Sequence, residues 1–231
     1  MNQTQSKAEP RTAKARRTRE AILGAALELM QEVGYERATM RAIAERAQVS
    51  IGNAYYYFRS KEDLVQAFYA RTHAEHLVVA RPRIAAARGL RQRLLATMSA
   101  KLETIEPYHP FAGVLFRTAA DPNSPLNPFS EESAPVREEA TQLFREVVLG
   151  AGLRLPKDLA AELPELLWTW HMGVILYWVH DTSEGRCKSW RLMEQSTALI
   201  ASAVRLSSLP LLAPLRRKAL QLVRELAEVE G

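Results

Sequence analysis

AILGAALELMQEVGYERATMRAIAERAQVSIGNAYYYFRSKEDLVQ, residues 21–66, decides the fold of this chain. Its apolar residues recur at helical spacing, and Gly34 then supplies a stop. Thr39 and Ser50 each offer an N-cap to a short helix, and a turn of two residues separates those helices. The stretch therefore predicts a long helix, two short helices joined by a tight turn, and the start of a fourth helix. The inward-facing apolar positions are Ile22, Ala26, Leu29, Met30, Val33, Ile43 and Ala47.

The short turn is typical of helix pairs that read DNA, because it fixes the two helices at a steep mutual angle. The second helix, predicted from Ile51 to Phe58, would enter the major groove with its N-terminal end, where side chains meet base edges and phosphates. Asn53 can pair bidentately with adenine, and Ile51 can touch a thymine methyl. These two residues are therefore the candidates for reading sequence.

The motifs of this stretch keep a fixed spacing. They are Gly34-Tyr35, Thr39-Met40-Arg41-Ala42-Ile43-Ala44, Ala47-Gln48-Val49-Ser50, Gly52, Tyr55-Tyr56-Tyr57-Phe58 and Ser60-Lys61-Glu62-Asp63-Leu64. Together they resemble the N-terminal domain of the tetracycline-repressor (TetR) family. The resemblance implies an all-helical, homodimeric transcription regulator that binds double-stranded operator DNA. It also implies a C-terminal domain that dimerises and often binds a small effector.

Two positions depart from the family pattern. Gln48 stands where glycine is usual, so the turn must either accept a non-glycine residue in a left-handed conformation or bend differently. Ala54 stands where a larger apolar residue is common, which would loosen the seating of the reading helix on its own domain. Both departures concern the geometry of the reading helix.

The three consecutive tyrosines, Tyr55, Tyr56 and Tyr57, lie about 100° apart around a helix and cannot all enter one core. Phenol groups bond phosphate oxygens and pack on sugars, and the resemblance favours Tyr55 and Tyr56 as such contacts. The alternative is that they only cap the domain core. At least one of the three must face outward.

Two basic residues are further candidates. Arg41 matches a family position that contacts DNA, and its alternative partner is Glu45 in an exposed ion pair. Lys61 lies in the first turn of its helix, where the helix dipole disfavours a positive charge. A contact with a DNA phosphate would explain a lysine at this position. The predicted DNA contacts are Thr39, Arg41, Ser50, Ile51, Gly52, Asn53, Tyr55, Tyr56, Tyr57 and Lys61.

Charge is concentrated at one end of the 231 residues, whose net charge is +5. Residues 1–60 hold ten Lys or Arg against six Asp or Glu, while the remainder balances at 21 against 20. This is the pattern of a DNA-facing end on a near-neutral body. Residues 1–18 read as a basic, disordered arm that follows a groove or is simply solvated charge. The basic residues in and directly after this region are Lys7, Arg11, Lys14, Arg16, Arg17 and Arg19.

Composition narrows the class of protein. The single cysteine, Cys187, excludes an internal disulfide and leaves too few thiolates for a structural zinc site. The first 19 residues lack the apolar core of a signal peptide. The run Leu166 to Val179 is shorter than the roughly 20 residues that span a bilayer, so we expect a buried helix there. A cytoplasmic protein without membrane, metal or cofactor is the simplest expectation.

The rest of the chain predicts helices punctuated by prolines. Ser60 caps a helix that should run to about Val79, before Pro82. The proline-rich segment 121–128 can be neither helix nor inner strand. Further helices are predicted near 90–105, 111–118, 132–150, 157–181, 185–207 and 211–229. No β alternation appears, so the fold should be all-α, with a helix-turn-helix domain at 19–65 and a helical effector-binding and dimerisation domain at 66–231.

The C-terminal region offers little chemistry. His171, His180, Asp181, Glu184 and Cys187 are close in sequence but lack the spacing of metal-ligand pairs, and no catalytic constellation stands out. His171 lies among aromatic residues, either as a hydrogen-bonded core histidine or as the polar group of an effector pocket. The candidate effector residues, with ordinary core as their alternative, are Met98, Tyr108, Phe111, Phe116, Phe144, Trp168, Trp170, His171 and Tyr177.

Dimerisation is expected through the helices near 157–181 and 185–207. The run Leu166 to Val179 is apolar almost all round and needs cover on more than one side, which a second copy would supply. Two such helices from each chain would form a four-helix interface, and its two-fold symmetry implies a palindromic operator. The candidate interface residues are Trp178, Met193, Ser196, Thr197, Ile200, Ala203 and Val204.

Three functional hypotheses follow. The leading one is a non-enzymatic, dimeric DNA-binding repressor that a hydrophobic or aromatic effector of unknown identity releases from its operator. The second is a DNA-binding regulator without small-molecule input, acting as an activator or through a protein partner. The third is a helical enzyme with an incidental helix-turn-helix.

Overall fold

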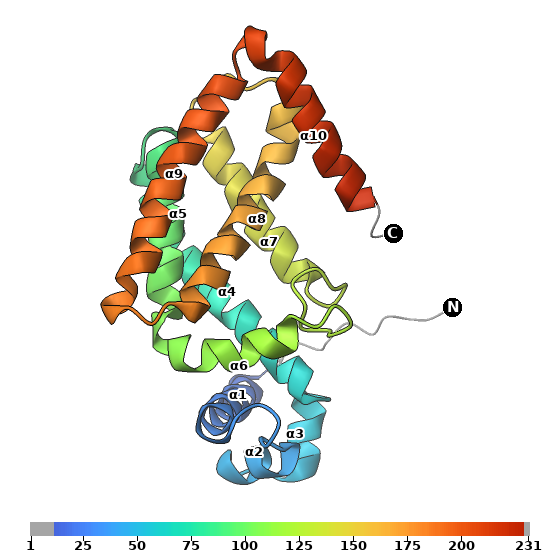
Figure 1. Ribbon diagram of the computed structural model, residues 1–231. Coiled ribbons are helices and arrows are strands. Elements are labelled where there is room, and N and C mark those ends of the chain that lie inside the picture. Colours follow the sequence, from blue (N-terminus) through green and yellow to red (C-terminus); the bar gives the residue numbers. More distant parts are fainter. Residues whose placement is uncertain (1–11, 229–231) are drawn as a thin grey trace. The chain divides into compact units, whose positions relative to one another are not determined.

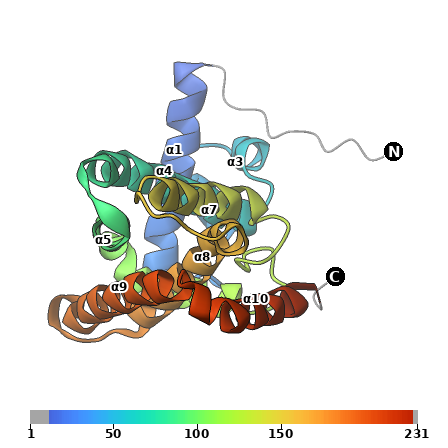
Figure 2. The same ribbon diagram turned by 90° about the horizontal axis from the view of Figure 1, so that it is seen from above.

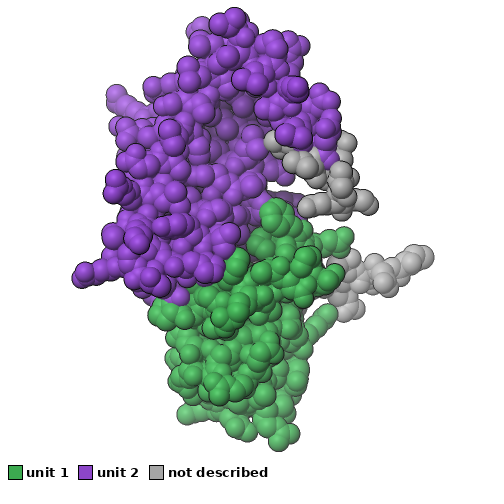
Figure 3. All heavy atoms as spheres, in the orientation of Figure 1, with its two compact units in different colours: residues 1–71, 110–132 green, residues 72–109, 133–231 purple. Residues whose placement is uncertain are grey.

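The computed structural model describes residues 12–228, apart from the side chains of 223 and 226–228. All regular secondary structure in that range is helical (Figure 1), as the sequence predicted. The described residues form two compact units, coloured separately in Figure 3. Unit 1 comprises Met1–Arg71 and Pro110–Glu132, and unit 2 comprises Thr72–His109 and Ser133–Gly231. The domain limits expected at 18 and 65 stay predictions.

Unit 1 begins with three helices, α1 (Ala13–Val33), α2 (Met40–Arg46) and α3 (Ile51–Tyr57). α1 packs on α2, and α2 packs on α3. Gly34 ends α1 with a φ of 84°, in the region that favours glycine. The shared core of the three helices is closed to water. Its fully or nearly fully buried side chains include Ile22, Leu23, Ala26, Met30, Ile43 and Ala54.

Residues 13–18, which were expected to belong to a disordered basic arm, are helical. Thr12 is the N-cap of α1, and its Oγ1 accepts a 3.1 Å hydrogen bond from the amide of Ala15. Lys14, Arg16 and Arg17 are therefore helical residues, because the cap starts the helix six residues before the predicted limit of the arm at 18. Lys7 and Arg11 lie outside the described residues.

Two further parts belong to unit 1: the first part of α4 (Lys61–Ala86), and α6 (His109–Ala119) from Pro110 onward with the turns that follow it. The segment 121–128 forms turns, as its three prolines predicted. The amide of Gln66 donates a 2.6 Å hydrogen bond to the carbonyl of Pro125, which ties these turns to α4.

α4 is longer than predicted. Pro82 lies inside it, and the helix continues to Ala86 instead of ending near Val79. Pro82 cannot donate to the carbonyl of Val78, but Pro82, Arg81 and Arg83 are exposed, so water can satisfy the released carbonyl. The helix is thus one uninterrupted element that contributes residues to both units.

Unit 2 is built around α8, a helix that packs on α7, α9 and α10 (Figures 1 and 2). α5 packs on α7 and α9. The helices predicted for this region are confirmed with small shifts of their ends. The remaining elements are α5 (Gly89–Ile105), η1 (Glu106–Tyr108), α7 (Ala134–Leu149), α8 (Lys157–His180), η2 (Glu184–Arg186), α9 (Cys187–Ser207), η3 (Pro210–Leu212) and α10 (Ala213–Glu228).

In residues 12–228, no single helix is long and apolar enough to cross a membrane. One pair of helices, Glu184–Ser207 with Pro210–Leu222, reaches that length and composition only when taken together, across a bend of 92°.

Candidate nucleic-acid interface

α2 and α3 begin at the caps that the sequence predicted. The Oγ1 of Thr39 accepts a 3.2 Å hydrogen bond from the amide of Ala42, and the Oγ of Ser50 accepts one of 3.2 Å from the amide of Asn53. Each cap satisfies a backbone donor that the first turn of a helix leaves without a partner. Thr39 and Ser50 therefore have a structural role, and their contact with DNA stays a prediction.

The turn between α2 and α3 holds Gln48 in a left-handed conformation, with a φ of 55°. The amide of Val49 donates to the carbonyl of Ala44 at 3.0 Å, and the amide of Gln48 donates to that of Glu45 at 3.1 Å. This is the hydrogen-bond pattern of a Schellman motif, which usually has glycine at the left-handed position. Of the two alternatives raised by the sequence, the turn keeps the glycine conformation without the glycine.

α3 is seated on the domain by one residue. Ala54 is fully buried and is the only buried side chain of the helix. The small side chain lets α3 approach the underlying helices closely, rather than leaving the helix loosely seated. Four of the seven residues of α3 are exposed, namely Ile51, Gly52, Tyr55 and Tyr56, as a groove-reading helix requires.

The exposed side of α3 carries the predicted DNA contacts. Tyr56 is 79% exposed, Tyr55 48% and Ile51 42%. Gly52 is exposed, while Asn53 is half-buried. The ring of Tyr57 meets that of Tyr56 edge to face at 5.1 Å, so Tyr57 supports the orientation of its neighbour. Tyr55 and Tyr56 do not cap the core of the domain.

Lys61 has a partner that the sequence did not predict. Its Nζ donates to the carbonyl of Tyr35 at 2.8 Å and to that of Glu36 at 3.3 Å, and it lies 4.3 Å from the centre of the Tyr35 ring. The hydrogen bonds to these two carbonyls account for a lysine at the start of α4, so no phosphate contact is needed to explain it. The argument that required a phosphate partner was therefore wrong, and DNA contact by Lys61 is no longer needed to account for it.

Arg41 is exposed on α2. Over the described part of the chain, the alternative ion pair to Glu45 is not found. The neighbouring Arg46 instead forms a bidentate pair with Glu32 of α1, both hydrogen bonds being 2.6 Å long. The ion pair holds α2 on α1, while Arg41 is left at the surface for another partner.

The candidate effector residues fall in different units. Phe111 and Phe116 belong to unit 1, where the Phe111 ring lies 6.5 Å from that of Phe68. The other seven belong to unit 2. Met98, Phe144, Trp168 and His171 are buried, Tyr108 and Trp170 are half-buried, and Tyr177 is 42% exposed.

Within unit 2, two of these residues meet. The rings of Phe144 on α7 and His171 on α8 lie 5.6 Å apart. Trp170 points elsewhere, because its Nε1 donates a 3.1 Å hydrogen bond to the Oγ of Ser196 on α9. The buried polar site suggested by the sequence is thus centred on His171, and Trp170 belongs to the packing of α8 on α9.

The predicted interface stripe on α9 is its inner face. Met193, Thr197 and Val204 are each at most 5% exposed in the single chain, because they pack toward the rest of unit 2. Ser196 and Ile200 are half-buried, and only Ala203 is fully exposed. These buried residues cannot contact a second copy. The outward apolar residues of α9 are Leu192, Leu199 and Leu206.

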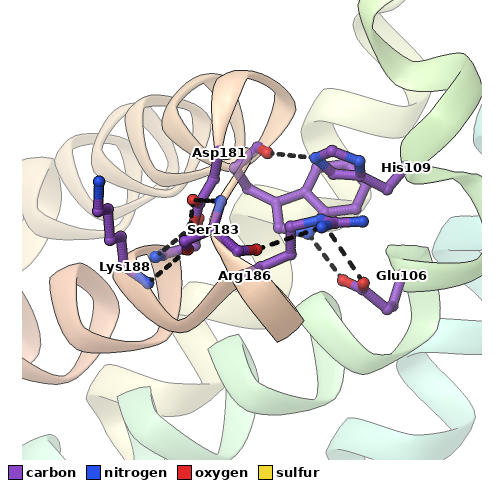
Figure 4. Close-up of polar contacts among 8 residues, drawn as sticks. Glu106, His109, Asp181, Ser183, Arg186 and Lys188 are labelled. Atoms are coloured by element: carbon purple, nitrogen blue, oxygen red, sulfur yellow. Dashed lines mark hydrogen bonds and ion pairs between the residues drawn. The ribbon is translucent and has the colours of Figure 1, made fainter.

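Trp178 is also an internal residue, 2% exposed, and Figure 4 shows its surroundings. Its Nε1 donates to Glu106 at 3.1 Å, and its carbonyl lies 2.8 Å from the Nε2 of His109. Arg186 lies 3.7 Å from Glu106 in an ion pair. These contacts join the end of α8 to η1 and to His109, and they join η2 to η1.

Asp181 shapes the turn between α8 and α9 (Figure 4). Its Oδ1 accepts from the amide and hydroxyl of Ser183 at 2.9 and 2.6 Å, and its Oδ2 accepts from those of Ser189 at 2.8 and 2.7 Å. Burial alone would raise the pKa of Asp181, but these hydrogen bonds hold it well below the usual range. The carboxylate is a structural cap.

Three buried basic residues were missed by the sequence analysis: His73 and His76 on α4, and Lys101 on α5. A signal for the first two existed. His73 and His76 are separated by three positions and share the helix face that holds the apolar residues Phe68 and Ala80. Histidines on the inner face of a helix are a mark of a buried polar site.

Comparison with known proteins agrees with this geometry. The sequence profile described as "Bacterial regulatory proteins, tetR family" matches residues 22–68, and the profile described as "Tetracyclin repressor-like, C-terminal domain" matches residues 93–223. The chain belongs to the TetR family. The helix-turn-helix is therefore the DNA-binding element of a TetR-family transcriptional regulator, as the sequence predicted.

TetR-family relatives share mainly the N-terminal part of this sequence. The HTH-type transcriptional repressor KstR of Rhodococcus jostii is 49% identical over 53 residues, which are 23% of this chain and 25% of the repressor. The HTH-type transcriptional regulator UidR of Escherichia coli is 40% identical over 67 residues, 29% of this chain and 31% of that protein. The matches thus span about a quarter to a third of these relatives.

Solved TetR-family structures share the fold over most of the chain. A regulator from Streptomyces coelicolor, 19% identical, has a TM-score of 0.62 and covers 93% of this chain and 98% of its own. A putative regulator from Syntrophomonas wolfei, 16% identical, has a TM-score of 0.66 over 81% and 96% of the two chains. The regulator FadR of Bacillus subtilis in complex with stearoyl-CoA, 17% identical, has a TM-score of 0.60 over 76% and 95%.

Proposed function

We propose that this TetR-family regulator is a homodimeric repressor that binds a palindromic operator through α3 and leaves it when a small effector binds unit 2. The observation that carries the DNA-binding part is the geometry of α3. One buried alanine anchors the helix, while Ile51 at its N-terminal end and Tyr55 and Tyr56 near its C-terminal end are exposed to solvent. The repressor KstR matches this region, which supports repression.

The dimer follows from apolar surface on two neighbouring helices of unit 2. Leu176 and Tyr177 on α8 are each 42% exposed, and Leu199 on α9 is 71% exposed. α8 and α9 pack on one another, so these residues can contribute to one surface that a second copy covers. A two-fold dimer would place its reading helices in successive major grooves, roughly 34 to 36 Å apart.

The effector part is supported by α4. A ligand releases DNA only if it binds one arrangement of the protein better than the other, so it must act on an element that affects the reading helices. α4 begins with Lys61, bonded to the carbonyls of the DNA-binding domain, and continues into unit 2 with His73 and His76. The fold neighbour FadR binds stearoyl-CoA, which supports a ligand-responsive role for this fold.

The test is selection of operators from random duplex DNA with the full-length protein. The expected product is a palindrome whose half-sites are about one helical turn apart. The double variant Ile51→Glu with Tyr55→Glu changes only exposed residues and should lose the selected operator. The matched control, Val78→Glu on the exposed side of α4, should keep it.

No enriched sequence would contradict the DNA-binding proposal, and an enriched sequence without two-fold symmetry would contradict the dimer. The effector part is tested separately by adding candidate ligands to the selected complex. A usual coupling of about 1 to 3 kcal/mol would weaken operator binding about 5- to 150-fold. An operator complex that none of the ligands weakens would instead favour a regulator without small-molecule input.

A further inference from the structure

The interior of unit 2 contains a cluster of basic side chains whose chemistry the proposed function does not explain. His73 and His76 on α4, Lys101 on α5 and His171 on α8 are each exposed by less than a tenth of their surface. We refer to these four residues as the basic cluster. Basic side chains are rarely buried together without an acid, because each loses its hydration.

The contacts of the basic cluster leave hydrogen-bonding capacity unused. The Nε2 of His76 lies 3.0 Å from the carbonyl of Thr97, and the rings of His73 and His76 are 6.1 Å apart. The buried Nε2 of His73 and Nδ1 of His171 have no direct hydrogen-bond partner. Within residues 12–228 no hydrogen bond or ion pair of Lys101 is found, and burial is the single cause of its pKa shift.

The pKa values of the basic cluster also reflect burial without a neutralising negative charge. Burial lowers the pKa of Lys101 to about 8, so its ammonium remains largely protonated near neutral pH. Burial, followed by the charge of Lys101, lowers the pKa of His73 to about 4 and that of His76 to about 3. The same two causes hold the pKa of His171 well below its usual range. The cluster is thus one buried ammonium beside three neutral imidazoles.

One carboxylate approaches the cluster from its rim. The Oε2 of Glu139 on α7 lies 3.6 Å from the Nε2 of His73, but the Glu139 side chain is 68% exposed and belongs to the surface. Glu139 also lines a surface hollow of about 790 Å³ between α4, α7 and α8, together with Leu77 and Arg81. Glu139 is therefore the residue shared by the hollow and the contact with His73.

The surroundings of the basic cluster are apolar. Met98 lies on α5 in the same helix segment as Lys101, and the Phe144 ring is 5.6 Å from His171. Trp168 precedes His171 by one turn of α8 and is 4% exposed. A molecule that pairs with Lys101 must accordingly place an acidic group among basic side chains and an apolar body among aromatic and aliphatic ones.

We propose that the basic cluster of unit 2 binds the carboxylate of a small acidic molecule with an apolar body. The carboxylate pairs with the ammonium of Lys101 and accepts hydrogen bonds from the free imidazole nitrogens of His73 and His171. A buried ion pair of this kind needs such additional hydrogen bonds to offset its loss of hydration. The inference rests on the proposed function, in which unit 2 holds the effector, and it specifies the chemical class of that effector.

The test compares probes that differ only in their head group. Decanoate, decanol and decyltrimethylammonium form one series, and 4-biphenylcarboxylate with 4-biphenylmethanol forms the other. Binding to the full-length protein, without DNA, is measured by isothermal titration calorimetry at pH 8 below any concentration at which the probes aggregate. At least one acid should bind ten times or more tighter than its alcohol, which corresponds to about 1.4 kcal/mol.

Two variants test whether the acidic probe binds at the basic cluster. Lys101→Met keeps the length of the side chain and should abolish the preference for the acid without lowering the melting temperature, because it removes an unpaired buried charge. His171→Phe should weaken the acid several-fold and leave the alcohol unchanged. Lys188→Met, which removes an exposed lysine of α9, is the matched control and should bind like the wild type.

Proton uptake provides an independent readout. A bound carboxylate raises the pKa of Lys101 from about 8, so the wild type should take up protons at pH 8 when it binds the acid. Titrations in two buffers of different ionisation enthalpy measure this uptake, and Lys101→Met should show less of it. The proposal is overturned if no acid binds, if alcohol or ammonium probes bind as tightly as the acids, or if Lys101→Met keeps the preference.

Operator binding is measured on the same preparation. The result for the proposed function can then be distinguished from the result for the proposed ligand class. Acid binding that leaves the operator complex intact would contradict effector-controlled release while keeping the ligand class. Operator binding by a protein that shows no preference for acids would contradict the ligand class alone.

Discussion

The hydroxyl of Tyr35 donates a 2.5 Å hydrogen bond to the Oε1 of Glu62. Tyr35 lies in the connection after α1, and Glu62 lies in the first turn of α4. Burial and then this hydrogen bond raise the pKa of Tyr35, so the phenol stays a donor at neutral pH. With the neighbouring Lys61 bonded to the Tyr35 carbonyl, two consecutive residues of α4 hold the start of the helix-turn-helix.

Tyr35→Phe should destabilise the DNA-binding unit. The variant keeps the ring but leaves the Glu62 carboxylate without its phenol donor, and a hydrogen bond to a charged group usually contributes about 1.5 to 3 kcal/mol. Urea unfolding measures the loss. Tyr56→Phe, at a position 79% exposed, is the control and should unfold like the wild type. Equal stability of all three proteins would show that the hydrogen bond contributes nothing.

Gln48→Gly should stabilise the protein, because a non-glycine residue at a φ of 55° carries a cost of roughly 1 kcal/mol that glycine avoids. Ala47→Gly is the matched control, since Ala47 has a φ of −74° and gains nothing from glycine. The midpoint of thermal unfolding should rise for Gln48→Gly and fall for Ala47→Gly. A fall in both would mean that the turn is not strained at Gln48.

Asn53→Ala and Tyr56→Phe should affect operator binding in different ways. Loss of a base contact by Asn53 typically costs ~1 to 3 kcal/mol and relaxes preference at one operator position. Loss of a phosphate contact by the Tyr56 hydroxyl weakens all sequences alike. Affinities for a library of single-base operator variants separate the two. An unchanged preference profile for Asn53→Ala would exclude it from base reading.

Leu199→Arg should convert the dimer to a monomer in sedimentation velocity experiments. The side chain is 71% exposed in the single chain, so arginine is tolerated by the fold and disturbs only a second copy that packs there. Val78→Arg, 76% exposed on α4, is the control and should remain dimeric. A dimer that survives Leu199→Arg would place the interface away from this face of α9.

Stability should fall as the pH decreases below about 6.5. Burial lowers the pKa of His73 to about 4 and that of His76 to about 3, so the unfolded chain binds protons in this range that the folded chain does not. The free energy of unfolding therefore decreases by up to about 1.4 kcal/mol per pH unit for each histidine.

Urea unfolding at pH 7.5, 6.5 and 5.5 measures that slope. His76→Gln should reduce it, whereas His180→Gln, which changes an exposed histidine, should not. A slope that His76→Gln leaves unchanged would assign the acid sensitivity to other groups.

The sequence predicted what depends on local signals. Thr39 and Ser50 cap helices through hydrogen bonds to amides three residues away, so their positions could be predicted without the rest of the fold. Pro82 misled the prediction, because a proline inside a helix removes one hydrogen bond and can kink the helix without ending it. Exposure of Pro82 is a property of the folded chain, and no local pattern encodes it.

Contacts between residues that are distant in the sequence were harder to predict. The helical spacing of apolar residues in α9 showed that one face of the helix is buried. The same spacing is expected whether that face packs against the rest of the chain or against a second copy. Met193 and Thr197 were therefore assigned to the wrong neighbour. Lys101 looked like an ordinary charged residue, because its burial depends on the packing of α5 against α7 and α9.

The exposed thiol at the start of α9 has a practical consequence. Cys187 is the only cysteine of the sequence, so a maleimide spin label attaches at one defined place without any substitution. In a two-fold dimer the two labels form a single pair, and pulsed electron paramagnetic resonance would report one distance between them. Recording that distance with and without operator and ligand would test the proposed dimer and its proposed response to ligand without any substitution.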